Sequence, residues 1–135
     1  MERLNIETHT LWEGFVGYAR AVRLGQFVYV AGTTATNAEG TLVSVGDPYG
    51  QTVQILTNIE AALRRAGARL EDVVRTRIYV TNIDHWEEIG RAHGEFFREI
   101  RPASTMVEVR RLVAPEMLVE IEADAVIVRG AEVSP

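Results

Sequence analysis

Two features of this 135-residue sequence have residue types and a spacing that suit chemistry. They are a loop-to-strand corner that carries hydroxyl groups and a carboxylate that follows it in the chain. Residues 101–109 leave a helical pattern at Pro102 and enter a strand through Ser104 and Thr105. Glu120 follows within a second strand pattern. Hydroxyls donate and accept hydrogen bonds, and a carboxylate can direct a water molecule. If the two strands are neighbours, these side chains predict a small-molecule site.

Two residue types are absent, and their absence narrows the chemistry. The sequence has no cysteine, and all 14 of its basic residues are arginine. Thiol nucleophiles, cysteine-bound metals, Schiff-base lysines and a P-loop lysine are therefore excluded. Arginine stays protonated, so it can hold an anion but cannot act as a base. Carboxylates, three histidines, tyrosines, hydroxyls and backbone groups remain, and we expect no metal site.

Charge and hydropathy set the expected partners. The formal net charge of −5 argues against nucleic acid as a partner, and also against a ribonuclease role, because phosphate binding relies on basic surfaces. No apolar run approaches the roughly 20 residues of a membrane span, and the first residues lack a signal-peptide layout. We expect a cytoplasmic protein with no membrane partner. Its length predicts a single domain over residues 1–135.

The elements that must position these residues alternate between strands and helices. Apolar alternation and turn residues predict a hairpin, two amphipathic helices and three further strands. The first helix begins at Asp47 and Pro48 and ends at Gly67, and the second cannot continue past Pro102. The expected order is strands 16–23 and 26–31, loop 32–46, helix 48–66, strand 73–80, a helix, and strands near 104–112 and 117–128. This order predicts an α+β domain in which both helices cover one face of one sheet.

The other face of the sheet carries charge. Glu120, Glu122 and Asp124 share one side of the last strand, where aligned like charges repel. Three arginines are available to pair with them, namely Arg75, Arg77 and Arg110. Such a face is either solvated or buried against a second subunit, and the pattern is compatible with both.

Several candidate residues have an ordinary structural interpretation beside the functional one. Glu120 could be a surface glutamate paired with a neighbouring arginine, and residues 32–36 could be an anion-binding loop or a plain turn. His93 lies on an apolar helix stripe, which favours a core or interface histidine over a metal ligand. Trp12 and Trp86 are expected to be packing residues.

Five segments together resemble the RidA (YjgF-like) family of enamine/imine deaminases along nearly the whole chain. They are residues 17–22 with 27–32, residues 51–59, residues 66–74, residues 102–109 and residues 119–123. The resemblance implies a chorismate-mutase-like fold of the bacterial type, assembled as a homotrimer with ligand sites in clefts between subunits. It also implies hydrolysis of small enamines or imines to keto acids and ammonia, without metal or cofactor.

The resemblance assigns roles residue by residue. Glu120 matches the glutamate that directs water, Tyr18 matches the family tyrosine, and Met106 stands in place of the usual cysteine. Ser104 stands where the family has an arginine that holds the substrate carboxylate. A lost bidentate contact to a carboxylate weakens binding, so we expect a non-standard substrate.

The candidate site therefore has one catalytic residue, Glu120, and a set of substrate-binding residues. Arg20 or Arg101 could restore the missing charge from another direction. The expected substrate-binding residues are Tyr18, Arg20, Gly32, Thr33, Arg101, Ser104, Thr105 and Met106. The expected function is a cofactor-free hydrolase of the RidA type acting on a small C=N metabolite. The alternative is a non-catalytic trimer that binds a small metabolite or a protein partner.

Overall fold

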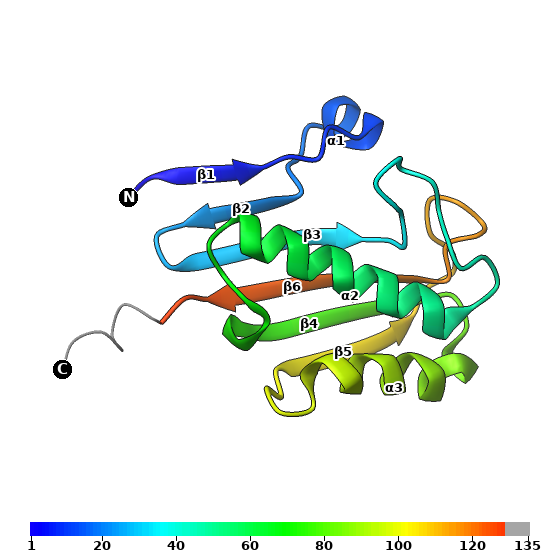
Figure 1. The fold of residues 1–135 in the computed structure, drawn as a ribbon. Helices are drawn as coiled ribbons and strands as arrows, with labels where there is room; N and C mark the ends of the chain where they lie inside the picture. The colour runs from blue at the N-terminus through cyan, green and yellow to red at the C-terminus, as the bar shows by residue number, and fades with distance from the viewer. Residues whose placement is uncertain (129–135) are drawn as a thin grey trace.

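The computed structural model describes residues 1–128, which form one six-stranded sheet with helices beside it (Figure 1). The strands lie in the order β1-β2-β3-β6-β4-β5. Their bounds are Arg3–Ile6 (β1), Ala21–Leu24 (β2), Phe27–Thr33 (β3), Val73–Val80 (β4), Ala103–Glu108 (β5) and Val119–Val126 (β6). The helices are α1 (Leu11–Val16), α2 (Pro48–Arg65) and α3 (Trp86–Phe97), with short 3-10 helices η1 (Leu70–Asp72) and η2 (Ile83–His85).

Helix α2 begins and ends where its residues require. The Asp47 carboxylate accepts a hydrogen bond of 3.0 Å from the Gly50 N–H, and Pro48 supplies the first helical residue. Gly67 lies just beyond the helix with φ of 86°, a conformation that favours glycine. The buried stripe of α2 includes Ile55, Leu56, Ile59 and Leu63.

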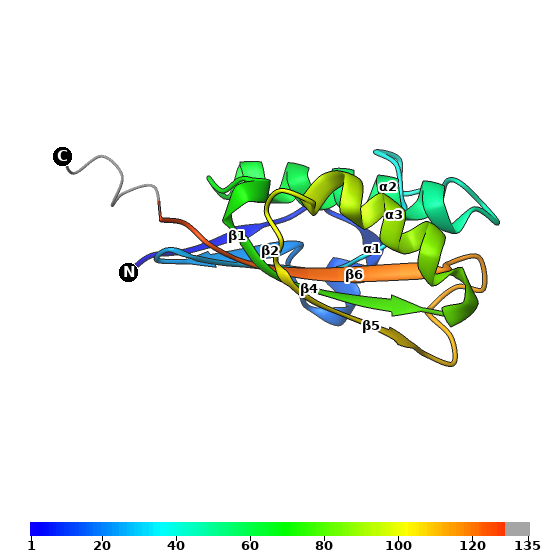
Figure 2. The ribbon, with the colours of Figure 1, turned by 90° about the horizontal axis from the view of Figure 1, so that it is seen from below.

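Helices α2 and α3 form a layer on one side of the sheet, here called the covered face (Figure 2). Alternation along β6 shows the division clearly, since Val119, Ile121, Ala123 and Ala125 are buried. The intervening residues Glu120, Glu122 and Asp124 lie on the other side, here called the open face. The predicted α+β class, with two helices on one face, is confirmed.

One pair of strands is parallel, and the rest of the sheet is antiparallel. Strands β4 and β5 run in parallel and are joined by the crossover through α3. Strand β6 lies between β3 and β4 and pairs antiparallel with both. The register between β3 and β6 shifts between Val30 and Thr33, which marks a β-bulge in β3.

The structure corrects several predicted elements at the start of the chain. Strand β1 and helix α1 were not predicted, because each is short and α1 exposes apolar residues such as Leu11 and Phe15. The strand predicted from residue 16 begins at Ala21. Gly32 and Thr33, predicted as loop, end strand β3.

Two further expectations change. The strand predicted over residues 104–112 ends at Glu108, so the paired arginines that follow lie outside it. Trp12 and Trp86 are 52% and 57% exposed, so neither is a core packing residue in this chain. Trp12 lies in the first turn of α1, and Trp86 is the first residue of α3, outside the stripe of Ile89, Ala92 and Phe97 that this helix buries.

Candidate active site on the open face

Arg20 is fixed between two strands just before β2 begins. Its backbone N–H donates to the Ile6 carbonyl at 2.8 Å, and its carbonyl accepts from the Ala31 N–H at 3.0 Å. Its Nη2 donates to the Gly32 carbonyl, and its guanidinium carbon lies 5.7 Å from the centre of the Tyr18 ring. The Arg20 Nε is buried and has no hydrogen-bond partner in residues 1–128. A buried N–H without a partner costs free energy, so this atom is suited to receive a ligand oxygen.

Gly32 makes room for the Glu120 carboxylate. A Cβ atom at position 32 would overlap Oε2 of Glu120 and would lie 3.0 Å from its carboxyl carbon. Gly32 lies in the bulged part of β3, directly beside β6. Bulges and glycines in strands commonly mark such close approaches. Glycine at this position therefore lets the Glu120 carboxylate take the place that a Cβ atom would fill.

The surroundings of Glu120 shift its pKa upwards. Partial burial disfavours the charged carboxylate and is the largest cause, and the negative charge of Glu122 acts in the same direction. The positive charge of Arg20 opposes both, but the pKa of Glu120 remains above its ordinary value. A carboxylate with a raised pKa is a better proton acceptor from water than an exposed one.

Gln51 positions the chain that leads into β6, a contribution that the sequence motifs did not predict. Its side-chain amide donates to the Glu116 carbonyl at 2.9 Å, and its Oε1 accepts from the Leu118 N–H at 2.9 Å. The residue is fully buried in α2. A glutamine on an otherwise apolar helix stripe was the available signal, because a buried amide needs hydrogen-bond partners.

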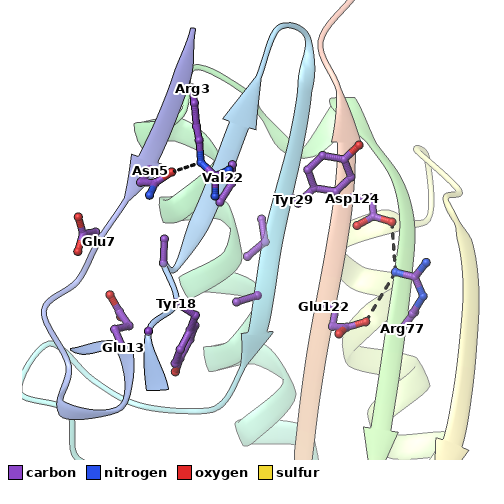
Figure 3. A pocket seen from close by; sticks show the side chains of 14 residues that line it. Arg3, Asn5, Glu7, Glu13, Tyr18, Val22, Tyr29, Arg77, Glu122 and Asp124 are labelled. Atoms are coloured by element: carbon purple, nitrogen blue, oxygen red, sulfur yellow. Dashed lines mark hydrogen bonds and ion pairs between the residues drawn. The ribbon is translucent and has the colours of Figure 1, made fainter. Parts of the chain in front are cut away.

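A depression of about 600 Å³ lies on the open face beside this site (Figure 3). Tyr18 and Ala31 line it, whereas Arg20, Gly32 and Glu120 do not, so it overlaps the predicted site only at its edge. Arg77 lies within hydrogen-bonding range of Asp124 at 3.2 Å and forms a longer ion pair with Glu122 at 3.6 Å. The predicted pairing of the acidic row with an arginine is therefore confirmed for Arg77.

Glu13 fixes α1 against this depression. Its carboxylate accepts hydrogen bonds from the Thr8 backbone and hydroxyl and from the Thr10 hydroxyl. Burial alone would raise the pKa of Glu13, but these hydrogen bonds outweigh it and hold the pKa below its ordinary value. The carboxylate is therefore ionised at neutral pH and stabilises the turn that leads to Tyr18.

The other predicted binding residues either have their side chains engaged within the fold or lie apart from Glu120 in this chain. Thr33 is buried, and its hydroxyl donates to the Ala31 carbonyl at 2.8 Å. Met106 packs against the core, and Thr105 is exposed on the open face of β5. Arg101 is exposed at the turn before β5, with φ of 60°.

Ser104 and Glu120 are separated within one chain. Ser104 pairs with the buried Thr76 in β4 and accepts a hydrogen bond from its hydroxyl at 2.8 Å, so it lies on the covered-face side. Glu120 lies on the open face, and β4 stands between the two strands. Two strand spacings alone amount to about 10 Å. The structure thus brings together Tyr18, Arg20, Gly32 and Glu120, and it leaves Ser104 apart from them.

Two kinds of feature are missing from the described part of the chain. Within residues 1–128, no three histidine, aspartate or glutamate side chains are arranged to hold a metal ion. None of the helices in this range has both the length and the apolar content needed to cross a membrane. The site is accordingly built from a carboxylate, an arginine, a tyrosine and backbone groups.

These features define a class: a small α+β domain with a half-buried carboxylate and an arginine on its open sheet face. A family profile described as Endoribonuclease L-PSP matches residues 12–127, which is most of the chain. The chain belongs to this family, also called the YjgF/RidA family, as its motifs predicted.

Individual relatives agree with this assignment. The Mycobacterium tuberculosis protein Rv2704, described as a member of the YjgF/YER057c/UK114 family, is 49% identical, with a TM-score of 0.86 over 93% of this chain and 100% of its own. The Escherichia coli YjgF gene product is 28% identical, with a TM-score of 0.77 over 90% of this chain and 93% of its own. The 3-aminoacrylate deaminase RutC of Acinetobacter baylyi is 35% identical over 104 residues, which cover 77% of this chain and 82% of that protein.

Proposed function

We propose that this protein is a cofactor-free hydrolase of the RidA type that acts on a small enamine or imine. The observation that carries the proposal is the Glu120 carboxylate, which is partly buried against Gly32, has a raised pKa and lies within the electrostatic influence of Arg20. The relative named 3-aminoacrylate deaminase acts, by that name, on an enamine, which supports the substrate class.

Glu120 directs the attacking water in this proposal. An enamine first gains a proton from solvent on carbon and becomes an iminium ion. Glu120 then accepts a proton from water as the water oxygen bonds to the iminium carbon, which gives a neutral carbinolamine. Glu120 returns this proton to the nitrogen, the carbon–nitrogen bond breaks with its electron pair on nitrogen, and the hydroxyl proton passes to solvent, which leaves ammonia and a carbonyl product. Each step uses only a carboxylate and water, which fits a chain without lysine or cysteine.

Arg20 holds the anionic end of the substrate in place of the arginine that Ser104 replaces. Its unpartnered Nε is the support for this assignment, because a ligand oxygen would satisfy it with a charge-assisted hydrogen bond. Tyr18 lies against the same guanidinium group. Arg20 would approach the substrate anion from a different direction than an arginine at position 104. We therefore expect the substrate to differ in shape from the family's standard one.

The complete site is formed between subunits of a homotrimer. Ser104 and Glu120 lie on opposite sides of the sheet and on strands separated by β4, which supports a cleft with contributions from two chains. In that cleft, the edge strand β5 of one subunit, with Ser104 near its start, lies beside Tyr18, Arg20 and Glu120 of the next. Light scattering tests the assembly, and a monomer at micromolar concentration would contradict the shared cleft.

A direct assay uses 2-iminopropionate or 3-aminoacrylate generated in solution, with keto-product release measured against the spontaneous rate. We expect Glu120→Gln to lower kcat by about 100-fold or more, a typical contribution of a general base. Arg20→Gln should instead act mainly on KM, by about 10-fold or more, because a charged hydrogen bond to substrate is lost. Glu88→Gln on the exposed surface of α3 is the matched control and should change neither.

The pH profile gives an independent readout. Only ionised Glu120 can accept a proton, so kcat/KM should rise with pH through a pKa above the ordinary 4.5 of a glutamate. The Glu120→Gln variant should lose that rise. If the wild-type protein binds these compounds but does not raise the rate above the spontaneous one, the protein is not a hydrolase of these compounds. The alternative of a non-catalytic metabolite-binding trimer would then take its place.

A further inference from the structure

A second cavity, of about 370 Å³, opens where α3 ends and the chain turns into β5. Its lining residues are His93, Gly94, Phe97, Arg98, Arg101 and Pro102. The cavity lies on the helical side of the sheet, because His93 reaches Thr76 on the covered face. It is therefore separate from the Glu120 site, which occupies the open face.

The two arginines of this cavity are available to a ligand. Both Arg98 and Arg101 are exposed, and neither takes part in an ion pair within residues 1–128. No carboxylate is among the lining residues. Arg91 on the same helix differs, because it pairs with Glu95 at 4.0 Å and lies 4.1 Å from the centre of the Tyr49 ring.

Gly94 and the turn at Arg101 shape the cavity around these arginines. A Cβ atom at position 94 would lie 2.8 Å from Nη2 of Arg98, so the missing side chain leaves room for the guanidinium group to fold over the helix. Arg101 has φ of 60°, which is uncommon for a residue other than glycine. Both arginines are thereby directed to the same concavity.

His93 connects the cavity to the covered face. Burial lowers its pKa, so the ring is neutral at pH 7 and adds no third positive charge. Its Nε2 lies 2.9 Å from the Thr76 hydroxyl, which in turn donates to Ser104. Nε2 of His93 and the hydroxyls of Thr76 and Ser104 thus form one continuous chain of polar contacts from the cavity to β5.

We propose that this cavity binds a phosphate-sized oxyanion, free or as the phosphoryl group of a small metabolite, between Arg98 and Arg101. Guanidinium forks match the oxygens of phosphate and form charge-assisted hydrogen bonds with them. The volume exceeds that of the ion alone and leaves room for an attached organic group beside Phe97. The simpler role, in which arginines offset the negative end of the helix dipole, needs neither the cavity nor the space above Gly94.

The test is a titration with inorganic phosphate followed by NMR of the histidine ring protons, at constant ionic strength because salt screens exposed charges. We expect saturable shifts at His93, with His9 and His85 as internal references, and a Kd of about 1 mM or tighter. Arg98→Gln and Arg101→Gln should each weaken binding by about fivefold or more, since each removes one charge-assisted contact. Arg91→Gln, the matched control, should stay within about twofold because that arginine is already paired.

A second titration with glycerol phosphate separates the two sources of the anion. Tighter binding than inorganic phosphate assigns the site to a phosphorylated metabolite, and equal binding assigns it to the free ion. The proposal fails if the His93 ring protons show no saturable chemical-shift change up to about 50 mM phosphate that exceeds the change in a sodium chloride control. This concentration range also covers weak charge-based contacts. It fails equally if Arg91→Gln weakens binding as much as Arg98→Gln, or if the arginine variants change only the free energy of unfolding. None of these outcomes depends on the hydrolase activity.

Discussion

The covered face and the open face of the sheet differ in how their polar groups find partners. On the covered face, α2 and α3 bury the apolar side of β6 and β4, and the polar groups there have partners inside the chain. Thr76 bonds to Ser104 and His93, and Gln51 bonds to the segment before β6. On the open face, Glu122 and Asp124 share Arg77, while Glu120 remains partly buried with a raised pKa.

This difference separates what stabilises the fold from what is left for function. The apolar core under the covered face is complete with residues of one chain. On the open face, burial disfavours the charged form of the Glu120 carboxylate, and the Nε of Arg20 has no hydrogen-bond partner in residues 1–128. Groups of this kind are expected where a ligand or a second subunit completes the hydrogen bonding.

The largest expected effect is on the covered face. Ile121→Ala removes a fully buried side chain from the central strand and should lower the free energy of unfolding by about 2–5 kcal/mol, through lost burial and a residual cavity. Urea unfolding measures it, with the exposed Val113→Ala as the control. A change below about 1 kcal/mol would mean that the core can collapse around the missing atoms.

An intermediate effect is expected where β3 meets the open-face carboxylate. Gly32→Ala places a Cβ against the carboxylate of Glu120, and because this group is the end of a flexible side chain, the free energy of unfolding should fall by only about 1 kcal/mol. Activity should fall with it, because the carboxylate has to move. Gly90→Ala is the matched control, since open space surrounds that helical glycine, and it should stabilise by about 0.5–1 kcal/mol. If the two variants had equal stability and equal activity, the close contact between Gly32 and Glu120 would play no part in the site.

The smallest effect is expected for the ion pairs of the open face. Arg77 is 41% exposed, so Arg77→Gln should cost less than about 1 kcal/mol in a single chain, and added salt should reduce the difference. Thermal unfolding at two salt concentrations measures this. A larger loss that shrinks towards this value on dilution would show that a second copy of the chain buries the pair.

The sequence predicted the covered face well because its signals are local. The cap at Asp47, the proline after it and Gly67 each act within one helical turn, and all three were confirmed. Alternation along β6 likewise placed Glu120, Glu122 and Asp124 on one side. Local patterns of this kind depend on side-chain periodicity alone.

The candidate site was harder to predict because its contacts depend on strand pairing. Arg20 reaches Gly32 only because β2 and β3 form a hairpin, and Glu120 reaches Gly32 only because β3 is bulged there. The opposite sides taken by Ser104 and Glu120 depend on the parallel register of β5 with β4. A shift of one residue in a strand exchanges its faces, and β5 has no fully buried residue whose apolar pattern would fix that register.

The central position of β6 has a consequence for how the molecule assembles during synthesis. Strand β6 (residues 119–126) joins β1, β2 and β3 to the parallel pair β4 and β5. These two groups of strands therefore cannot form one continuous sheet until β6 has paired with both. Translation has to pass residue 126 before the two halves can join. Until then, the facing edges of β3 and β4 are unpaired and prone to pair with other chains. We therefore expect the rate of folding to be governed by the docking of β6, the most non-local pairing in the sheet.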